Sequence, residues 1–244
     1  MRLRRLCRNG RALIVPLDEG LRAGPVEGFE NPLQLIKRIA RSPADAVLLS
    51  PGLLEQAAAE LGQLGVILRI ECGAGGPLVS AADAVSLGAD AVVTRATLGG
   101  EREHEELHRL ARVIGQARRW NLPVVAETLP AGRPAALAAG IARAVRIAAE
   151  MGADVIAAPY TGEPESFRRL VASAGRPVLV AGGPLRDSSL RALLELVDQS
   201  LSAGAEGVML SGGLRDPDST LAALAALVHE DAGVESALAA AQQA

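Results

Sequence analysis

Short, wholly apolar runs alternate with segments of helical periodicity along the 244-residue chain. Strands buried on both faces read as continuous apolar runs, and their alternation with helices is typical of a parallel sheet. Eight such runs are present, and the chain is close to the roughly 250 residues of a TIM barrel. The pattern therefore predicts an α/β fold, a single (β/α)8 TIM-barrel domain over residues 1–244. The predicted strands are Ala12–Leu17, Ala46–Leu49, Val66–Ile70, Ala91–Arg95, Pro123–Glu127, Val155–Ala158, Pro177–Ala181 and Gly207–Leu210.

A weak internal repeat supports this arrangement. An Ala-Asp or Ala-Glu pair comes directly before every second predicted strand, which indicates a βαβα unit used four times. The alternative is chance, because Gly-Ala-Asp is common in alanine-rich sequences. The pairs are Ala44-Asp45, Ala89-Asp90, Ala153-Asp154 and Ala205-Glu206. The alanine-rich tail is expected to be the fraying end of the last helix.

Composition limits both the core and the partners. Hydrophobic residues make up 49% of the chain but aromatic residues only 2%, so Ala, Val, Leu and Ile must fill the barrel. A net charge of −3 argues against a nucleic-acid or anionic-membrane surface. No apolar stretch reaches the roughly 18 residues of a membrane span, and we expect a cytoplasmic protein. Cys7 and Cys72 lack metal-ligand spacing and are expected to be reduced thiols.

Charged residues gather where the predicted strands end, which is where the functional site of a TIM barrel lies. One interpretation makes Asp18 or Glu127 a general base for enolisation or dehydration, or makes the carboxylates a hard-metal site. The other has acids and arginines only neutralising one another in ion pairs. In strand order the residues at this mouth are Asp18, Glu19, Arg69, Glu71, Arg95, Glu127 and Tyr160.

The seventh and eighth predicted strands both run into paired glycines. TIM barrels often bind phosphate between these two loops, through free backbone N–H groups at a helix N-terminus. The alternative is that the glycines only make tight turns. The predicted phosphate-binding residues are Gly182, Gly183, Ser211, Gly212, Gly213 and Arg215.

Several segments, in the right order, resemble the archaeal-type class I fructose-bisphosphate aldolases and 2-amino-3,7-dideoxy-D-threo-hept-6-ulosonate synthases. The opening PLDEGLRAGPVEGFENP is closest to the second group, and ADAVLLSPG, LPVVAETLPAG, GADVIAAPYTG and AGGP continue the likeness. The resemblance implies a barrel that binds a small phosphorylated, sugar-phosphate-like metabolite and cleaves or forms a carbon–carbon bond. It also implies a ring of subunits, which we expect to be a homo-oligomer. A catalytically silent paralogue would instead form a hetero-oligomer with an active homologue.

The departures from this family are as informative as the matches. The Schiff-base lysine of the family falls on Ala157, its tyrosine after strand five on Leu129, and its phosphate-binding arginine in strand eight on Ser211-Gly212-Gly213. The only lysine, Lys37, lies in a helical pattern of the outer ring. Imine formation requires a neutral amine, which arginine cannot supply, so Schiff-base chemistry is excluded by the residues available.

Two functional hypotheses follow. In the first, the protein is an aldolase-like lyase whose carbon–carbon chemistry has been lost or rebuilt without an imine, with Asp18, Glu127 and Tyr160 as catalytic candidates. In the second, it is a silent aldolase paralogue with an assembly or regulatory role. Neither hypothesis calls for a cofactor or a structural metal.

A third, remote hypothesis comes from His104 and His108, which match the zinc-protease pattern H-E-x-x-H. Both histidines would share one helix face and could serve a zinc hydrolase. The surrounding residues Glu101, Arg102 and Glu103 are instead typical of a solvated helix start.

Overall fold

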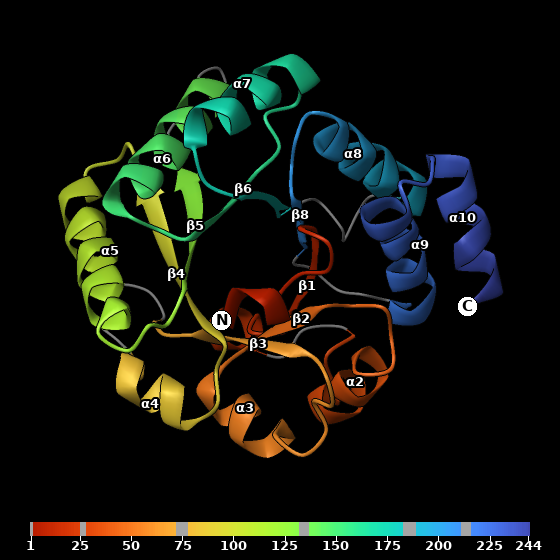
Figure 1. Cartoon of the computed structure of the whole chain (residues 1–244), viewed down its shortest axis with the longest axis horizontal. Coiled ribbons are helices and arrows are strands. Elements are labelled where there is room, and N and C mark those ends of the chain that lie inside the picture. Colours follow the sequence, from red (N-terminus) through yellow and green to blue (C-terminus); the bar gives the residue numbers. More distant parts are fainter. Residues whose placement is uncertain (1, 25–27, 72–77, 132–136, 183–188, 211–215) are drawn as a thin grey trace.

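The computed structural model describes residues 2–24, 28–71, 78–131, 137–182, 189–210 and 216–244. All eight strands are parallel and pair in sequence order, and β8 closes the barrel against β1. The predicted TIM barrel is thereby confirmed (Figure 1). The strands are β1 (Ala12–Pro16), β2 (Ala46–Leu49), β3 (Gly65–Arg69), β4 (Ala91–Leu98), β5 (Val124–Pro130), β6 (Val155–Ala158), β7 (Val178–Ala181) and β8 (Gly207–Met209).

Helices surround the barrel as an outer ring (Figure 1). The alanine-rich tail is a separate helix, packed against α9 and α8, and not the fraying end of the preceding one. The chain turns between the two at Asp231, which has a left-handed backbone (φ 52°). The helices are η1 (Arg2–Arg5), α1 (Gly20–Ala23), α2 (Pro32–Ile39), α3 (Pro51–Ala57), α4 (Ala81–Ser86), α5 (Glu103–Arg118), α6 (Leu137–Met151), α7 (Pro164–Ala174), α8 (Leu190–Ser202), α9 (Pro217–Glu230) and α10 (Val234–Gln243).

The Ala-Asp repeat has a structural cause. Asp45 accepts a hydrogen bond from the backbone N–H of Leu13 (2.7 Å), at the start of β1. Asp90 accepts the same kind of bond from the backbone N–H of Val66 near the start of β3 (3.0 Å). Asp154 accepts one from the backbone N–H of Val124 at the start of β5 (2.9 Å). Each aspartate therefore satisfies a backbone donor at the amino end of the barrel, where the sheet ladder begins. Three of the four units of the predicted repeat share this contact.

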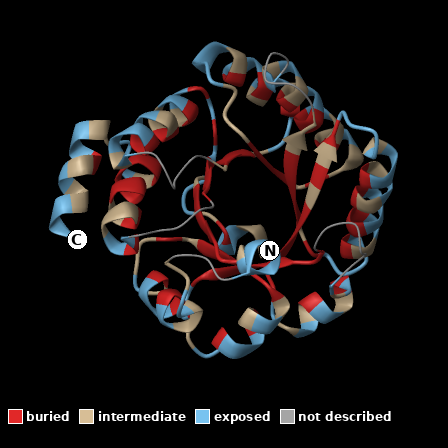
Figure 2. Cartoon of the chain, turned by 180° about the vertical axis from the view of Figure 1, so that it is seen from behind, coloured by how far each residue is buried: buried red, intermediate tan, exposed pale blue. Residues whose placement is uncertain are grey.

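Buried residues lie along the strands and on parts of the surrounding helices (Figure 2), and their side chains form two core layers. A large layer fills the space between strands and helices, and a smaller one fills the barrel interior. Side chains alternate between the two faces of a strand, so residues two apart face the same way. Ile67 and Val125 lie in the interior layer, and hence Arg69 and Glu127, two residues further on, also face the barrel axis.

Strands β4 and β5 are longer than predicted. Their pairing continues from Val92↔Val124 to Leu98↔Pro130, beyond the predicted ends at Arg95 and Glu127. The extra pairs hold Arg95 and Glu127 in adjacent, regular strands. This rigid backbone positions both side chains for the site described below.

Gly207 lies where β8 pairs with β1 to close the barrel, and there is no room for a side chain at this position. Its φ is +137°, and an added Cβ would lie 2.1 Å from the carbonyl oxygen of Ala12. We expect Gly207→Ala to reduce the free energy of unfolding by roughly 3 kcal/mol or more, measured by urea denaturation. The matched control is Gly115→Ala on α5, where an added Cβ meets nothing within 4 Å. That variant should gain about 0.5–1 kcal/mol, and equal effects in both would contradict the explanation.

Candidate functional site

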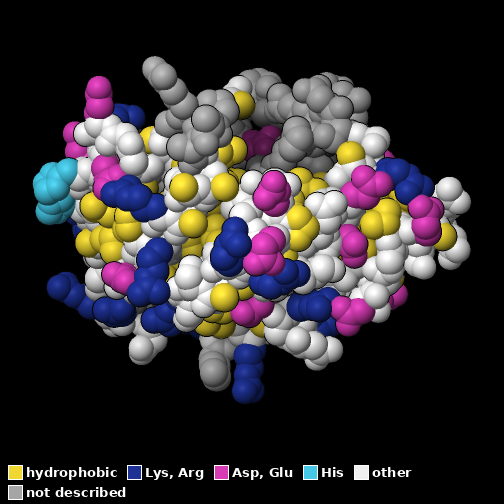
Figure 3. Space-filling view, turned by 90° about the horizontal axis from the view of Figure 1, so that it is seen from above, with side chains coloured by type: hydrophobic (Ala, Val, Ile, Leu, Met, Phe, Trp, Pro, Cys, Tyr) yellow, Lys and Arg dark blue, Asp and Glu magenta, His cyan; other side chains and the backbone are white. Residues whose placement is uncertain are grey.

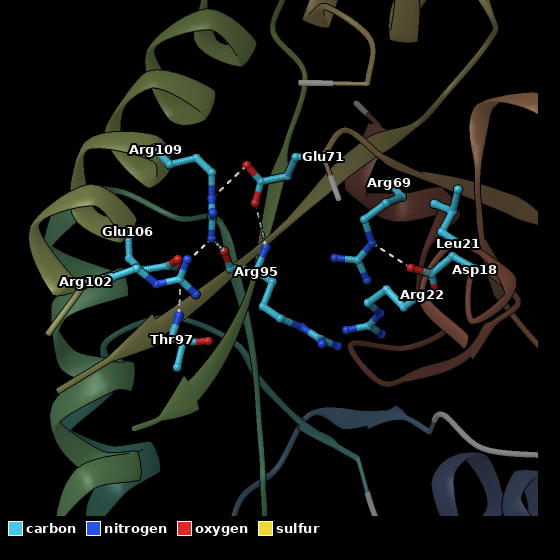
Figure 4. A pocket seen from close by; sticks show the side chains of 10 residues that line it. All are labelled: Asp18, Leu21, Arg22, Arg69, Glu71, Arg95, Thr97, Arg102, Glu106 and Arg109. Carbon is cyan, nitrogen blue, oxygen red and sulfur yellow. Dashed lines mark hydrogen bonds and ion pairs between the residues drawn. The ribbon is translucent and has the colours of Figure 1, made fainter. Parts of the chain in front are cut away.

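A pocket of about 170 Å³ opens at the carboxyl ends of the strands, between α1, β3, β4 and the start of α5. Figure 4 shows side chains from these elements pointing into it from opposite walls. Arginines and carboxylates dominate the lining, so the pocket is rich in charged groups. Its described lining residues are Asp18, Leu21, Arg22, Arg69, Glu71, Arg95, Thr97, Arg102, Glu106 and Arg109.

Arg69 connects two acids across the barrel mouth. Its Nε donates to Asp18 Oδ2 (2.6 Å) and its Nη2 donates to Glu127 Oε2 (3.0 Å). All three side chains are buried, with exposures of 6% for Arg69, 3% for Asp18 and 11% for Glu127. Asp18 follows β1, Arg69 ends β3 and Glu127 lies within β5, and alternate strands of a TIM barrel contribute to one layer of its interior. These three strands therefore bring the predicted site residues together.

Arg95 completes the pairing of Glu127. Its Nε lies 3.0 Å from Glu127 Oε2 and its Nη2 lies 2.5 Å from Oε1, a bidentate contact between neighbouring strands. Burial opposes ionisation of Glu127, but the hydrogen bonds from Arg95 and the charges of Arg69 and Arg95 hold its pKa below the ordinary value. For Arg69, burial disfavours the cation, yet Asp18 and Glu127 raise its pKa. Glu127 is thus held as a carboxylate.

Glu71 behaves differently. It accepts hydrogen bonds from Thr94 Oγ1 (2.5 Å) and from the backbone N–H of Arg95 (3.2 Å), and Arg109 Nε lies 2.9 Å from its second oxygen. Burial is the largest effect on this carboxyl and raises its pKa, although these three partners favour the charged form. The mouth therefore contains two glutamates whose pKa values move in opposite directions.

The buried carboxylate of Glu106 joins α5 to β4. It accepts a hydrogen bond from the backbone N–H of Thr97 (2.9 Å) and a short one from Arg109, which also donates to the carbonyl of Arg95 (2.8 Å). Sequence reasoning missed Glu106 and Arg109, because both lie in what reads as a solvated helix start. Their signal was spacing: positions three apart lie on one helix face, and this face packs on the barrel.

The histidines of the H-E-x-x-H pattern lie on the same helix but point elsewhere. His104 and His108 are exposed, with their rings edge to face at a centroid distance of 4.2 Å. Figure 3 shows histidine side chains at one edge of a surface that mixes acidic and basic residues. Within the described ranges no group of three or more His, Cys, Asp or Glu side chains could hold a metal. The described residues therefore supply no third ligand for the zinc site that the pattern suggests.

The structure also gives the positions of Ala157, Leu129 and Lys37, the residues on which the sequence departs from the aldolase pattern. Ala157 is fully buried in the barrel interior and pairs in register with Glu127. Leu129 lies further along β5, opposite Thr97 of β4. Lys37 lies on the outer helix α2, half exposed, with its Nζ 3.1 Å from Glu60. The only lysine of the chain is thus outside the barrel.

Tyr160 is not brought to this pocket. Its hydroxyl donates to Gln199 Oε1 on α8 (3.2 Å), and its ring packs on Phe167 of α7 at 5.3 Å. Glu19 precedes α1 and does not line the pocket in the described structure. Of the predicted phosphate-binding residues, Gly182 has a left-handed backbone (φ 71°). Gly183, Ser211, Gly212, Gly213 and Arg215 lie outside the described residues, as does Cys72.

Comparisons with known proteins agree on one family. A model of the DeoC/LacD aldolases matches residues 12–213. The 2-amino-3,7-dideoxy-D-threo-hept-6-ulosonate synthase of Halobacterium salinarum is 35% identical over 98% of this chain and 94% of its own length. The 2-amino-4,5-dihydroxy-6-oxo-7-(phosphonooxy)heptanoate synthase of Streptomyces griseus is 31% identical over 94% of this chain and 89% of its own. A solved Schiff-base-forming fructose-1,6-bisphosphate aldolase superposes with a TM-score of 0.83 at 32% identity, covering 93% of this chain and 98% of the other.

No helix within the described ranges has the length and apolar character needed to cross a membrane.

The two glutamates predict opposite pH dependences of stability. The lowered pKa of Glu127 stabilises the fold above the unfolded value near 4.5, and this contribution is lost as the pH falls through the folded pKa. Glu127→Gln should therefore cost roughly 3–5 kcal/mol near pH 7 and less near pH 4. The raised pKa of Glu71 gives the opposite pH dependence. The protonated carboxyl stabilises the fold at low pH, and this contribution to the free energy of unfolding is lost as the pH rises through the folded pKa. The cost of Glu71→Gln should shrink toward pH 7.

Urea denaturation of both variants and the parent protein across this pH range measures the two trends. At each pH, the free energy of unfolding of the parent is subtracted from that of the variant. This difference removes the contribution of the other titrating groups, which the two proteins share. Trends of the same sign for both glutamates would contradict the assignment.

Proposed function

Because the chain belongs to the DeoC/LacD aldolase family, we propose that its barrel mouth binds a small phosphorylated metabolite and performs carbon–carbon lyase chemistry without a lysine imine. The observation that supports this most is Arg69, a buried guanidinium that bridges Asp18 and Glu127. Glu127 in turn pairs in register with Ala157, which the resemblance aligns with the family's lysine. A fixed cation at this place substitutes electrostatic stabilisation for covalent catalysis.

The proposed reaction is an aldol cleavage with an enolate intermediate. A carboxylate, Asp18 or Glu127, takes the proton of the hydroxyl next to the bond that breaks, and that C–O becomes a carbonyl. The electron pair of the carbon–carbon bond moves onto the other fragment as an enolate, whose oxygen faces the guanidinium groups of Arg69 and Arg95. The enolate carbon is then protonated by the acid formed in the first step. No oxidant, reductant or metal enters this balance.

Phosphate binding remains a sequence-based part of the proposal. The paired glycines after β7 and β8 fit the phosphate site that TIM barrels often carry there. Arg215 would restore the charge lost with the family's arginine. Both relatives named above are synthases. The product in the first name is a dideoxy-heptulosonate, and the product in the second name carries a phosphonooxy group.

A second candidate function is a silent aldolase paralogue that assembles with, or regulates, an active homologue. It is favoured by the lowered pKa of Glu127, which makes this carboxylate a weak base. The charged side chains at the mouth also pair with one another, as expected if their role is only to neutralise each other's charge. These residues are Asp18, Arg69, Glu127 and Arg95. Turnover distinguishes this candidate from the lyase.

The absence of an imine is tested by borohydride trapping. Borohydride reduces a protein–substrate imine to a stable amine, which adds mass to the protein. We expect no adduct on Lys37 after incubation with fructose 1,6-bisphosphate, because its Nζ pairs with Glu60 outside the barrel. A Schiff-base-forming fructose-1,6-bisphosphate aldolase treated in parallel is the positive control. Substrate-dependent labelling of Lys37, seen by mass spectrometry, would refute the proposal.

The acid–base role is tested by Asp18→Asn. We expect turnover on a sugar-phosphate panel, read as aldehyde release, to fall on the order of 100-fold or more because the general base is lost. The control is Asp218→Asn, an exposed aspartate on α9 that pairs with Arg38. Its turnover should equal that of the parent. Equal rates for both variants would remove Asp18 from the mechanism, and a parent without turnover would favour the silent paralogue.

A further inference from the structure

Two histidines lie side by side on the outward face of α5, away from the mouth. His104 and His108 are both exposed, and their rings meet edge to face with centroids 4.2 Å apart. Positions four apart are neighbours on one helix face, one turn from each other. Figure 3 shows histidine side chains gathered at one edge of the molecule. The proposed lyase chemistry uses neither of them.

The spacing of the two rings suits a shared metal ion. A zinc–imidazole bond is about 2.0–2.1 Å long, so two nitrogens bound to one ion lie roughly 3–4 Å apart. Ring centroids 4.2 Å apart leave the nitrogens within reach of that separation. The terminal torsion of a histidine is broad, so an exposed ring can turn its nitrogen toward the ion while the helix stays in place.

The imidazole nitrogens determine the class of ion. Imidazole suits Zn²⁺, Cu²⁺ and Ni²⁺, whereas Mg²⁺ and Ca²⁺ prefer oxygen ligands. A catalytic zinc ion has three protein ligands, and the described residues offer no third one beside this pair. Two imidazoles with water in the other coordination positions therefore fit a bound ion without hydrolase chemistry.

The same turns of α5 carry contacts to the mouth on their inward face. Between the two histidines, Glu106 accepts a hydrogen bond from the backbone N–H of Thr97 on β4 (2.9 Å). One residue after the pair, Arg109 donates to the carbonyl of Arg95 (2.8 Å), and its Nε lies 2.9 Å from Glu71. Helix ends fray, so an ion that links the first two turns from outside would help to hold these inward contacts.

We propose that His104 and His108 chelate a divalent late transition-metal ion, which fastens the first turns of α5 against the barrel. The ion lies outside the mouth and takes no part in bond cleavage. It acts on stability, because a ligand that binds the folded helix more tightly than the unfolded chain shifts the equilibrium toward the folded state. The proposal does not depend on the lyase chemistry or on a phosphorylated ligand.

Isothermal titration of the protein, prepared without a histidine tag, tests the chelate with Ni²⁺, Zn²⁺ and Mg²⁺ as probes. The variants are His104→Gln, His108→Gln and the double variant, which all keep a polar side chain on the exposed face. We expect the parent to bind Ni²⁺ and Zn²⁺ but not Mg²⁺. Each single variant should bind at least about 10-fold more weakly, because the second ligand of a chelate acts at a high effective concentration. Each should lose almost as much affinity as the double variant.

The matched control is Glu105→Gln, an exposed carboxylate between the two histidines. It separates ligation by imidazole from the general attraction of a cation to negative charge, and its affinity should stay within about threefold of the parent. Single variants that each keep half of the bound ion at an unchanged Kd would reveal two separate sites and overturn the chelate. Binding that survives in the double variant, falls equally in the control or is missing in the parent would also overturn it.

Amide hydrogen exchange with Zn²⁺ tests the fastening of α5. The readout is the backbone N–H of Thr97, whose hydrogen bond to Glu106 breaks when the first turns of α5 open. We expect Zn²⁺ to slow this exchange at least about threefold in the parent and to leave it unchanged in the double variant. An unchanged exchange rate in a parent that binds Zn²⁺ would refute the link between the ion and the barrel.

Discussion

The barrel mouth depends on one shared cation, the buried guanidinium of Arg69. It holds Asp18 and Glu127 from opposite sides, and Arg95 fixes Glu127 a second time. Buried charges are costly unless each has a partner, so these four residues are stable only as a set. Because they come from β1, β3, β4 and β5, the rigid barrel determines their spacing.

The ion-pair network around Arg69 lies near the position that the resemblance aligns with the lysine of the related aldolases. At the position where the sequence resemblance places the family's lysine, this chain has a small buried alanine, Ala157, paired in register with Glu127. The guanidinium of Arg69 contributes a permanent positive charge, which cannot form a covalent intermediate but can stabilise a developing oxyanion. Arg95 and Arg69 thereby hold Glu127 as a carboxylate.

The sequence predicted the barrel and most of its polar mouth for a simple reason. Strand alternation and the rule that strands end at the mouth suffice to bring Asp18, Arg69, Arg95 and Glu127 together. Strand alternation does not apply beyond the end of a strand, so it does not predict where the side chain of Tyr160 points. Tyr160 lies after the end of β6, and its hydroxyl donates a hydrogen bond to Gln199 on α8.

Pairing and side-chain direction outside the strands could not be predicted either. Glu106 is buried against β4 within a helix start that reads as solvated, and Arg22 lies on a helix of only four residues. The last helix was missed because alanine-rich sequence marks no boundary, whereas the left-handed turn at Asp231 does. Each of these features depends on packing between elements that the local pattern does not encode.

The most direct test of this account is thermal unfolding of the protein with and without phosphorylated sugars, each compared with its unphosphorylated counterpart. A ligand at about 100 times its Kd adds roughly 2.7 kcal/mol of stability, which is readily seen as a higher Tm. We expect a higher Tm with at least one phosphorylated sugar and none with the matching free sugar. Equal Tm values for every pair would contradict the claim that this arginine-rich mouth recognises a phosphorylated metabolite.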